Sequence, residues 1–392
     1  MIFQHVSPAS SSWTENVARA LKTRLERPPP CLSLLPTTAE VRNLARRFRE
    51  QFSTILVLGT GGSSLGGQVL HALAPKQAGP SLIFLEDIHP EAFYATLSAC
   101  DPAHTGVVAI SKSGRTTETL CQLLAIFEHF CPPQQTPHFC VLTEAGPSPL
   151  RALAETYSFD CIAVPSEIGG RFSVFSVTGL FPALLAGVEE EALLRGARAM
   201  QARLREGELL QALAVAAEYA HAQKPHIFLE YDPRLNAFAR WYQQLWSETL
   251  GKEGRGSLFL TARGTIDQHS QFQLYLDGPK GAFFTALGLA QRDTRRLFRP
   301  PLHDGALDLL SQTTMGHLLE VEFQASCDTL RAEKIPIRQG ILPVFDAETM
   351  GALLSYSLHE VLVVADLLFV DPFSQPAIER LKERTLQILG RP

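Results

Sequence analysis

The sequence predicts an α/β fold with two mainly parallel β-sheets, each packed between layers of helices. Short apolar runs alternate with helical patterns from residue 54 to residue 163, and polar or glycine-rich loops follow two of these runs. Strands that alternate with helices form parallel sheets with helices on both faces. The alternation starts again at residue 225, after a long helical stretch, so we expect a second unit of the same kind.

The order of these patterns divides the chain into four segments. Residues 1–45 are predicted to form a helical and irregular N-terminal segment, and residues 46–200 the first α/β unit. Residues 201–370 are predicted to form the second unit, and residues 371–392 a C-terminal helix. That helix begins at Pro376, because proline is favoured in the first helical turn.

The predicted strands of both units are short apolar runs. In the first unit they begin near Ile55, Ser81, Gly106, His138 and Asp160. In the second unit two runs are clear, and they begin near Pro225 and Gly256. A helix that ends at Gly251 lies between these two runs.

Composition narrows the class of protein. The chain has 392 residues, of which 45% are apolar and 19% charged, and its net charge is −5. This length can bury sizeable cores, and a slightly acidic chain gives no support to a nucleic-acid or anionic-membrane partner. The seven cysteines contain no C-x-x-C pair, which argues against disulfides and a zinc site and for a reducing compartment. We therefore expect a cytoplasmic protein without a bound metal.

Two stretches have the apolar character of membrane segments. Residues 173–188 are too few for a span and contain Pro182, and three polar residues interrupt residues 351–370. We expect both to be buried helices. The N-terminus has no basic start followed by an apolar region, so no signal peptide is expected.

Two polar loops follow the first and third predicted strands, at the sheet edge where such folds bind ligands. The first, GTGGSSLGG at residues 59–67, permits close backbone approach, and the next helix points its N–H groups at the loop. The second, SKSGRTTE at residues 111–118, offers hydroxyls and a lysine at a helix start. Together they predict an anion cradle for a phosphate, with plain helix capping as the alternative. Neither loop fits the P-loop or dinucleotide patterns.

Further candidates lie on predicted helices. Arg171 follows two glycines and precedes an uncharged helix, so it must find an anion or a carboxylate. Gln244 and Glu248 share one helical face, and the apolar neighbours Leu245 and Trp246 indicate a setting that suits a general base. A structural ion pair and a solvated glutamate are the alternative explanations.

Three more candidates stand in the second half of the chain. His269 follows a predicted strand, and Gln375 and Lys382 lie seven residues apart, on one face of the C-terminal helix. Taken singly, a lone histidine is most often structural and a helical lysine most often solvated.

Six stretches, in this order, resemble the motif series of the phosphoglucose isomerase (glucose-6-phosphate isomerase) family. They are GTGGSSLG, SKSGRTTET, GGRFSVFS, QLWSETLGK, DQHSQFQL and DPFSQPAIERLK, which span residues 59 to 382. The resemblance implies two sugar-isomerase (SIS) subdomains, and an active site between them and across a homodimer interface. It also implies the reversible conversion of glucose 6-phosphate to fructose 6-phosphate, in glycolysis and gluconeogenesis, with no cofactor.

The resemblance assigns a role to each matching residue. The phosphate would be held by the two polar loops, through the backbone of Gly62 and Ser63 and through Ser111, Lys112, Ser113 and Thr116. Glu248 would move a proton between C2 and C1 through a cis-enediol, while Arg171 stabilises the enediolate oxygens. Lys382 and the partner subunit's His269 would open the sugar ring. Two glutamines, Gln244 and Gln375, would bind sugar hydroxyls.

The chain departs from the usual family pattern at a few positions, none of which is a predicted catalytic group. These are Arg115, Ser357, Leu358, Asp371, Ser374 and Ala377. Two alternatives from other classes are disfavoured. A non-catalytic sugar-phosphate sensor would not need Glu248, His269 and Lys382 together, and an NAD-dependent dehydrogenase would need the missing dinucleotide fingerprint. An isomerase that also accepts mannose 6-phosphate stays open.

Overall fold

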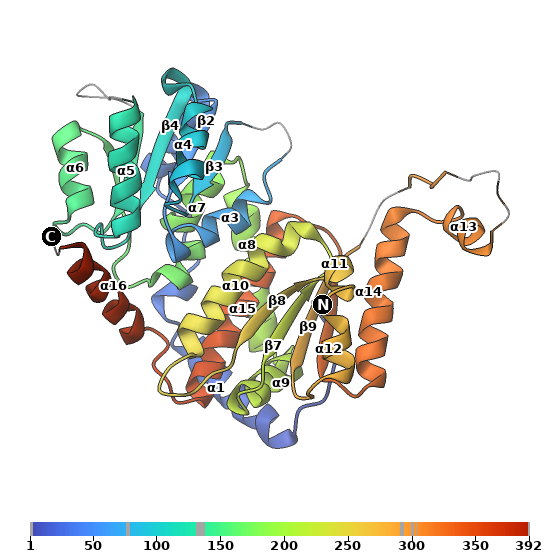
Figure 1. Ribbon diagram of the computed structural model, residues 1–392. Helices are drawn as coiled ribbons and strands as arrows, with labels where there is room; N and C mark the ends of the chain where they lie inside the picture. Colours follow the sequence, from blue (N-terminus) through green and yellow to red (C-terminus); the bar gives the residue numbers. More distant parts are fainter. Residues whose placement is uncertain are drawn as a thin grey trace.

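The computed structural model describes residues 3–75, 79–130, 138–290, 294–298, 302 and 304–390. It contains two five-stranded sheets, with the strand orders β3-β2-β4-β5-β6 and β1-β10-β9-β7-β8 (Figure 1). Every pairing between these strands is parallel except that of β1 with β10. The predicted α/β class with two mainly parallel sheets is therefore confirmed.

The first sheet consists of the five strands that the apolar runs predict: β2 (Thr54–Leu58), β3 (Ser81–Leu85), β4 (Thr105–Ile110), β5 (Phe139–Thr143) and β6 (Asp160–Ala163). The chain crosses from β2 to β3 on one side and from β4 to β5 on the other, so β2 and β4 flank the switch point. In such sheets the loops beyond the switch point diverge and leave a crevice for ligands. Both predicted phosphate loops begin there.

The second sheet includes strands that the sequence patterns did not single out. Its members are β7 (His226–Glu230), β8 (Phe259–Arg263), β9 (Phe283–Leu289), β10 (Ile337–Leu342) and β1 (His5–Val6). The first two are the predicted runs. The short β1 comes from the N-terminal segment and pairs antiparallel with β10, so the start of the chain completes the second sheet.

Helices cover both sheets. In the first half of the chain they are α1 (Ser11–Glu26), α2 (Ala39–Gln51), α3 (Leu65–His71), α4 (Pro90–Ser98), α5 (Thr117–Phe130), α6 (Pro149–Tyr157), α7 (Val177–Leu185) and α8 (Glu190–Arg205). In the second half they are α9 (Leu210–His221), α10 (Asn236–Leu250), α11 (Gly264–Gln268), α12 (Phe272–Asp277), α13 (Gly305–Leu310), α14 (Met315–Ala332), α15 (Ala347–Leu367) and α16 (Pro376–Leu389). Two short 3-10 turns matter for the site, η2 (Gly61–Ser63) and η4 (Gly170–Phe175).

The two apolar stretches are buried, as predicted. Within the described residues α15 alone has the length and hydropathy of a membrane span, and 83% of that window is buried inside the protein. It packs against α8, α1, α10 and α9, which makes it a central helix of the core. Residues 173–188 form η4 and α7, and Pro182 lies inside α7.

Helix α10 connects the two units. It contacts β7 and β8 of the second sheet, and on its other side it contacts α3, η2 and η4 of the first unit (Figure 1). Arg240 on α10 also pairs with Glu86 at the end of β3, at 2.5 Å. The helix that carries Gln244 and Glu248 is thereby placed beside the first sheet's ligand loops. The division of the chain at residue 200 stays a prediction, since α8 packs along α15.

Candidate active site

The glycine-rich loop after β2 touches both of the segments that carry the central candidates. A Cβ atom on Gly62 would lie 2.2 Å from the carbonyl carbon of Gly170 and 2.7 Å from the backbone nitrogen of Arg171. Gly61 has φ +53°, and a Cβ atom there would lie 2.9 Å from Nε2 of Gln244. Glycine is thus required for close approach, and the loop packs against both η4 and α10.

The hydroxyl-rich loop after β4 brings two of its predicted phosphate ligands together. The side chain of Ser111 is buried, and its Oγ lies 2.8 Å from Oγ1 of Thr116. Thr116 directly precedes α5, and its carbonyl accepts the N–H of Leu120 in the first turn of that helix. The two hydroxyls therefore lie at a helix N-terminus, where the helix dipole favours an anion.

Two other predicted phosphate ligands are engaged differently. Lys112 donates from Nζ to the carbonyl of Ser166 at 2.6 Å and lies 3.5 Å from Oε1 of Glu144. It therefore spans the ends of β5 and β6. Ser113 is exposed, and its Oγ accepts the N–H of Arg115 at 3.3 Å. The structure thus places Ser111 and Thr116 together, while Lys112 and Ser113 point to other partners.

Arg171 is the centre of a polar cluster between the two units. Its side chain is 1% exposed, and Nη1 lies 3.3 Å from Oε2 of Glu248. Nη1 also donates to Oε1 of Gln375 at 2.9 Å. The other oxygen of Glu248 accepts the amide of Gln244 at 2.9 Å. The cluster unites four predicted site residues from η4, α10 and the segment before α16.

The electrostatics of the cluster follow from burial. Burial lowers the pKa of Arg171, and the nearby carboxylate of Glu248 opposes that shift. Arg171 was expected to find an anion or a carboxylate, and the structure places it against the carboxylate of Glu248. The expectation of an apolar setting for Glu248 is wrong: Leu245 and Trp246 are buried, but the carboxylate itself is 28% exposed and bonded to polar groups.

Two atoms of the cluster are incompletely paired. Nε of Arg171 and Oε1 of Gln244 are buried and have no hydrogen-bond partner among the described residues. A buried polar group left unpaired costs about 1–3 kcal/mol, so native structures rarely retain one without a function. Their presence in one cluster is typical of a binding site.

The two predicted ring-opening residues lie outside this cluster. His269 is exposed and follows α11, beyond the edge strand β8 of the second sheet. Lys382 lies on α16, a helix without buried residues, and its ammonium donates to Glu379 at 2.9 Å. Among the described contacts, no hydrogen bond or ion pair joins either residue to Glu248.

The groups that hold the segment before α16 were not predicted from the sequence. Nη2 of Arg171 donates to the carbonyls of Pro372 and, at 3.2 Å, Ser374, and Lys252 donates to the carbonyl of Asp371. Lys252 stands in the quoted stretch QLWSETLGK and has no role in the motif comparison. A lysine directly after a helix-ending glycine was the available signal.

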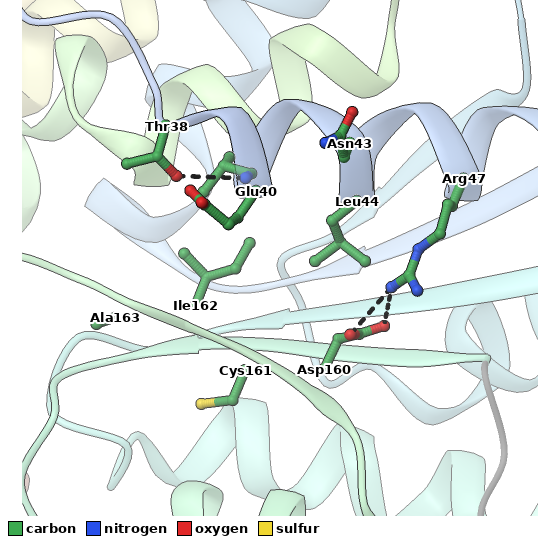
Figure 2. Close-up of a pocket in the computed structure, with 10 residues that line it drawn as sticks. Thr38, Glu40, Asn43, Leu44, Arg47, Asp160, Cys161, Ile162 and Ala163 are labelled. Carbon is green, nitrogen blue, oxygen red and sulfur yellow. Dashed lines mark hydrogen bonds and ion pairs between the residues drawn. The ribbon is translucent and has the colours of Figure 1, made fainter.

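A cavity of about 630 Å³ lies elsewhere, between α2 and the edge strand β6 (Figure 2). Figure 2 shows Arg47 on one wall and Asp160 on the other, and they form an ion pair at 2.9 Å. No residue of the polar cluster lines this cavity. Because Arg47, the cationic residue that lines this cavity, is already paired with Asp160, we assign the functional site to the cluster around Arg171.

Two mainly parallel sheets, a hydroxyl-lined loop at a helix start and a buried arginine paired with a partly exposed glutamate define a protein of the phosphosugar isomerase class. Comparison with known proteins is specific: the family model for phosphoglucose isomerase matches residues 46–303. The chain is 33% identical to glucose-6-phosphate isomerase of Rubrobacter xylanophilus, over 95% of this chain and 92% of the relative. It is 32% identical to that of Thermus thermophilus, over 91% and 89%. The chain belongs to the phosphoglucose isomerase family.

Solved structures show the same fold. A hypothetical protein from Thermus thermophilus superimposes with a TM-score of 0.84 at 29% identity, covering 96% of this chain and 95% of the other. A glucose-6-phosphate isomerase from Chlamydia trachomatis gives a TM-score of 0.75 at 20% identity, covering 96% and 78%. The predicted SIS-type architecture is therefore confirmed.

Proposed function

We propose that this protein interconverts glucose 6-phosphate and fructose 6-phosphate. The observation that carries the proposal is the contact between Arg171 and Glu248, with Gln244 and Gln375 bonded to the same pair. A carboxylate beside a buried cation has the two groups that aldose–ketose isomerisation needs. One moves a proton between adjacent carbons, and the other stabilises the oxygens that become negative.

In the proposed mechanism Glu248 removes the proton from C2 of the open-chain aldose and returns it to C1. The intermediate is a cis-enediol, and its developing negative charge faces the guanidinium of Arg171. Because that guanidinium is already held by Gln375 and backbone carbonyls, little reorganisation accompanies the reaction. Gln244 and Gln375 are placed to bind sugar hydroxyls.

The phosphate is proposed to bind Ser111, Thr116 and the N-terminus of α5, with the backbone of Gly62 and Ser63 opposite. The short distance between the two hydroxyls and their place at a helix start support this. Lys112 and Ser113 remain proposed ligands, and each would have to leave its present partner. Binding energy from the phosphate orients the sugar for the chemical step.

Ring opening is assigned to Lys382 and to the partner subunit's His269. Apolar side chains around His269 support a homodimer that shares its sites. Leu258, directly before β8, is 70% exposed, and Ile266 on α11 and Leu274 on α12 are 56% and 60% exposed. Exposed apolar side chains that gather beside an edge strand are typical of an interface.

The proposed setting is glycolysis and gluconeogenesis in the cytoplasm. The cysteines that the structure describes are free thiols, which supports a reducing compartment. Within the part of the chain that the structure describes, no group of three or more His, Cys, Asp or Glu side chains is placed to hold a metal ion. We propose a reaction without metal or cofactor.

A coupled assay tests the proposal. Purified protein is given fructose 6-phosphate, and glucose 6-phosphate is followed through its dehydrogenase, with and without EDTA. We expect turnover in both conditions. Absence of turnover would refute the isomerase function, and a loss with EDTA that a divalent ion restores would refute the metal-free mechanism. Mannose 6-phosphate in the same assay decides whether specificity is relaxed.

A further inference from the structure

The segment that joins α15 to α16 is bound by cationic side chains along its length. Three of them hold its backbone carbonyls: Arg255 binds Leu368, Lys252 binds Asp371, and Arg171 binds Pro372 and Ser374. A carbonyl that accepts from a charged donor is held more strongly than one in a neutral hydrogen bond. The segment is therefore fixed from outside, although α16 beyond it has no buried residue.

Lys252 occupies a particular place in this arrangement. It follows Gly251, at the end of α10, and stands four residues after Glu248. Its ammonium thus ties the end of the helix that carries Glu248 to the start of the 371–375 turn. The other end of that turn supplies Gln375, which accepts from Arg171 at 2.9 Å. The contacts therefore form a closed series: Lys252 binds the turn, the turn binds Arg171, and Arg171 binds Glu248 on the helix that precedes Lys252.

Charged groups on several elements face Lys252. Burial lowers its pKa to about 8, and the positive charge of Arg171 on η4 adds to this shift. Asp371 in the turn, Glu248 on α10 and the neighbouring Glu253 oppose it. Because a lysine is charged below its pKa, the ammonium is present at neutral pH and is lost as pH rises through about 8.

We propose that Lys252 is a positioning residue for the isomerisation. Its ammonium fixes the 371–375 turn, and the turn in turn holds Arg171 and Gln375 against Glu248. The inference rests on the proposed function for the roles of Arg171 and Glu248. The tie between Lys252 and the turn can be tested apart from that function.

The carboxylate of Asp371 strengthens the tie between Lys252 and the turn. Its Oδ1 accepts the N–H of Phe373 at 3.0 Å, a bond that an asparagine oxygen could also accept. The charge of Asp371 is what asparagine would lack. It favours the ammonium form of Lys252, so an Asp371→Asn variant should lose the tie at a lower pH than wild type.

Hydrogen exchange measures the tie directly. Peptides covering residues 368–378 are compared by mass spectrometry in wild type, Lys252→Met, Lys252→Arg and Lys22→Met. The control Lys22 lies on α1 with a side chain 77% exposed. Loss of one charge-assisted hydrogen bond should speed exchange about ten-fold in Lys252→Met. Lys252→Arg and Lys22→Met should stay near wild type, and unchanged exchange in Lys252→Met overturns the proposal.

Kinetics then separate positioning from general stability. In Lys252→Met we expect kcat to fall about ten- to hundred-fold, while the inhibition constant of inorganic phosphate, which reports the cradle at Ser111, stays unchanged. Wild-type kcat should decrease above pH 8, where Lys252 loses its charge. In Lys252→Arg this alkaline decrease of kcat should occur at higher pH, because arginine stays charged. In Asp371→Asn the alkaline decrease of kcat should occur at lower pH than in wild type.

The outcomes distinguish this proposal from the proposed function. A wild-type protein that does not convert fructose 6-phosphate refutes the function, and the exchange data alone then decide whether Lys252 holds the turn. If the wild-type enzyme is active and Lys252→Met keeps both the wild-type kcat and its decrease at alkaline pH, Lys252 is not a positioning residue. The isomerase function would stand in that case.

Discussion

The guanidinium of Arg171 lies 3.3 Å from the carboxylate of Glu248, although 77 positions separate the two residues in the chain. Arg171 stands on η4 beside the first sheet, and Glu248 stands on α10 beside the second. The glycine-rich loop after β2 packs against both elements. The pair is therefore formed by the packing of the two units against each other, and the chemistry proposed for it depends on that packing.

Replacing Glu248 by glutamine should leave the fold intact and remove most of the turnover. Glutamine keeps the shape, and its single amide oxygen can still accept from one of the two donors, Arg171 or Gln244, but the amide cannot take a proton. A general base contributes about 10²–10⁴-fold, so kcat should fall by that factor. Glu15→Gln, an exposed glutamate on α1, is the matched control. Near-normal kcat in Glu248→Gln would show that another group is the base.

The hydroxyl-rich loop after β4 predicts effects of different size on phosphate binding for its three hydroxyl residues. Ser111→Ala and Thr116→Ala should raise KM for fructose 6-phosphate, because their hydroxyls lie together at the start of α5. A lost hydrogen bond to a charged group costs about 1.5–3 kcal/mol, which is roughly 10- to 150-fold in binding. Ser113→Ala should have a smaller effect, since that hydroxyl is exposed and already accepts from Arg115. Equal KM values in all three variants would contradict the geometry.

Subunit complementation tests whether His269 acts across a dimer. Glu248→Gln and His269→Ala are unfolded together and refolded as a mixture. If the histidine acts on the other subunit, each hybrid dimer has one intact site and one that lacks both groups. About half of the dimers are hybrids, so activity should recover to roughly a quarter of wild type. A mixture no more active than the mean of the two variants, with His269→Ala clearly impaired alone, would place the histidine in its own subunit's site.

A buried ion pair makes a prediction about stability. Arg338 and Glu360 are fully buried and paired, and Tyr242 and Tyr356 donate to the same carboxylate. Burial lowers the pKa of Arg338 and raises that of Glu360, so each charge depends on the other. Arg338→Met should lower the free energy of unfolding by about 3–5 kcal/mol, measured by urea denaturation. The double variant Arg338→Met/Glu360→Leu should recover much of this loss. If the single and the double variant were equally destabilised, the pairing would be contradicted.

Local sequence patterns were enough to predict much of the fold. The strands of the first sheet and the loops after β2 and β4 follow from apolar runs bounded by glycine, proline and hydroxyl residues, because these act over a few residues of chain. The buried character of residues 351–370 also followed from composition, since charges at this spacing suit a protein core better than a membrane. By contrast, β1 has two residues, and its place in the second sheet depends on pairing with the distant β10.

For the site, local sequence patterns were enough to identify the groups that are chemically able to act. A lone arginine before an apolar helix had to find an anion or a carboxylate, because an unpaired buried charge is too costly. Three contacts of the folded chain could not be predicted in this way: Arg171 with Glu248, Lys112 with Ser166, and Lys252 with the turn before α16. These contacts join segments far apart in the chain. The packing of the two sheets and α10 determines which residues come into contact, and local sequence patterns do not predict that packing.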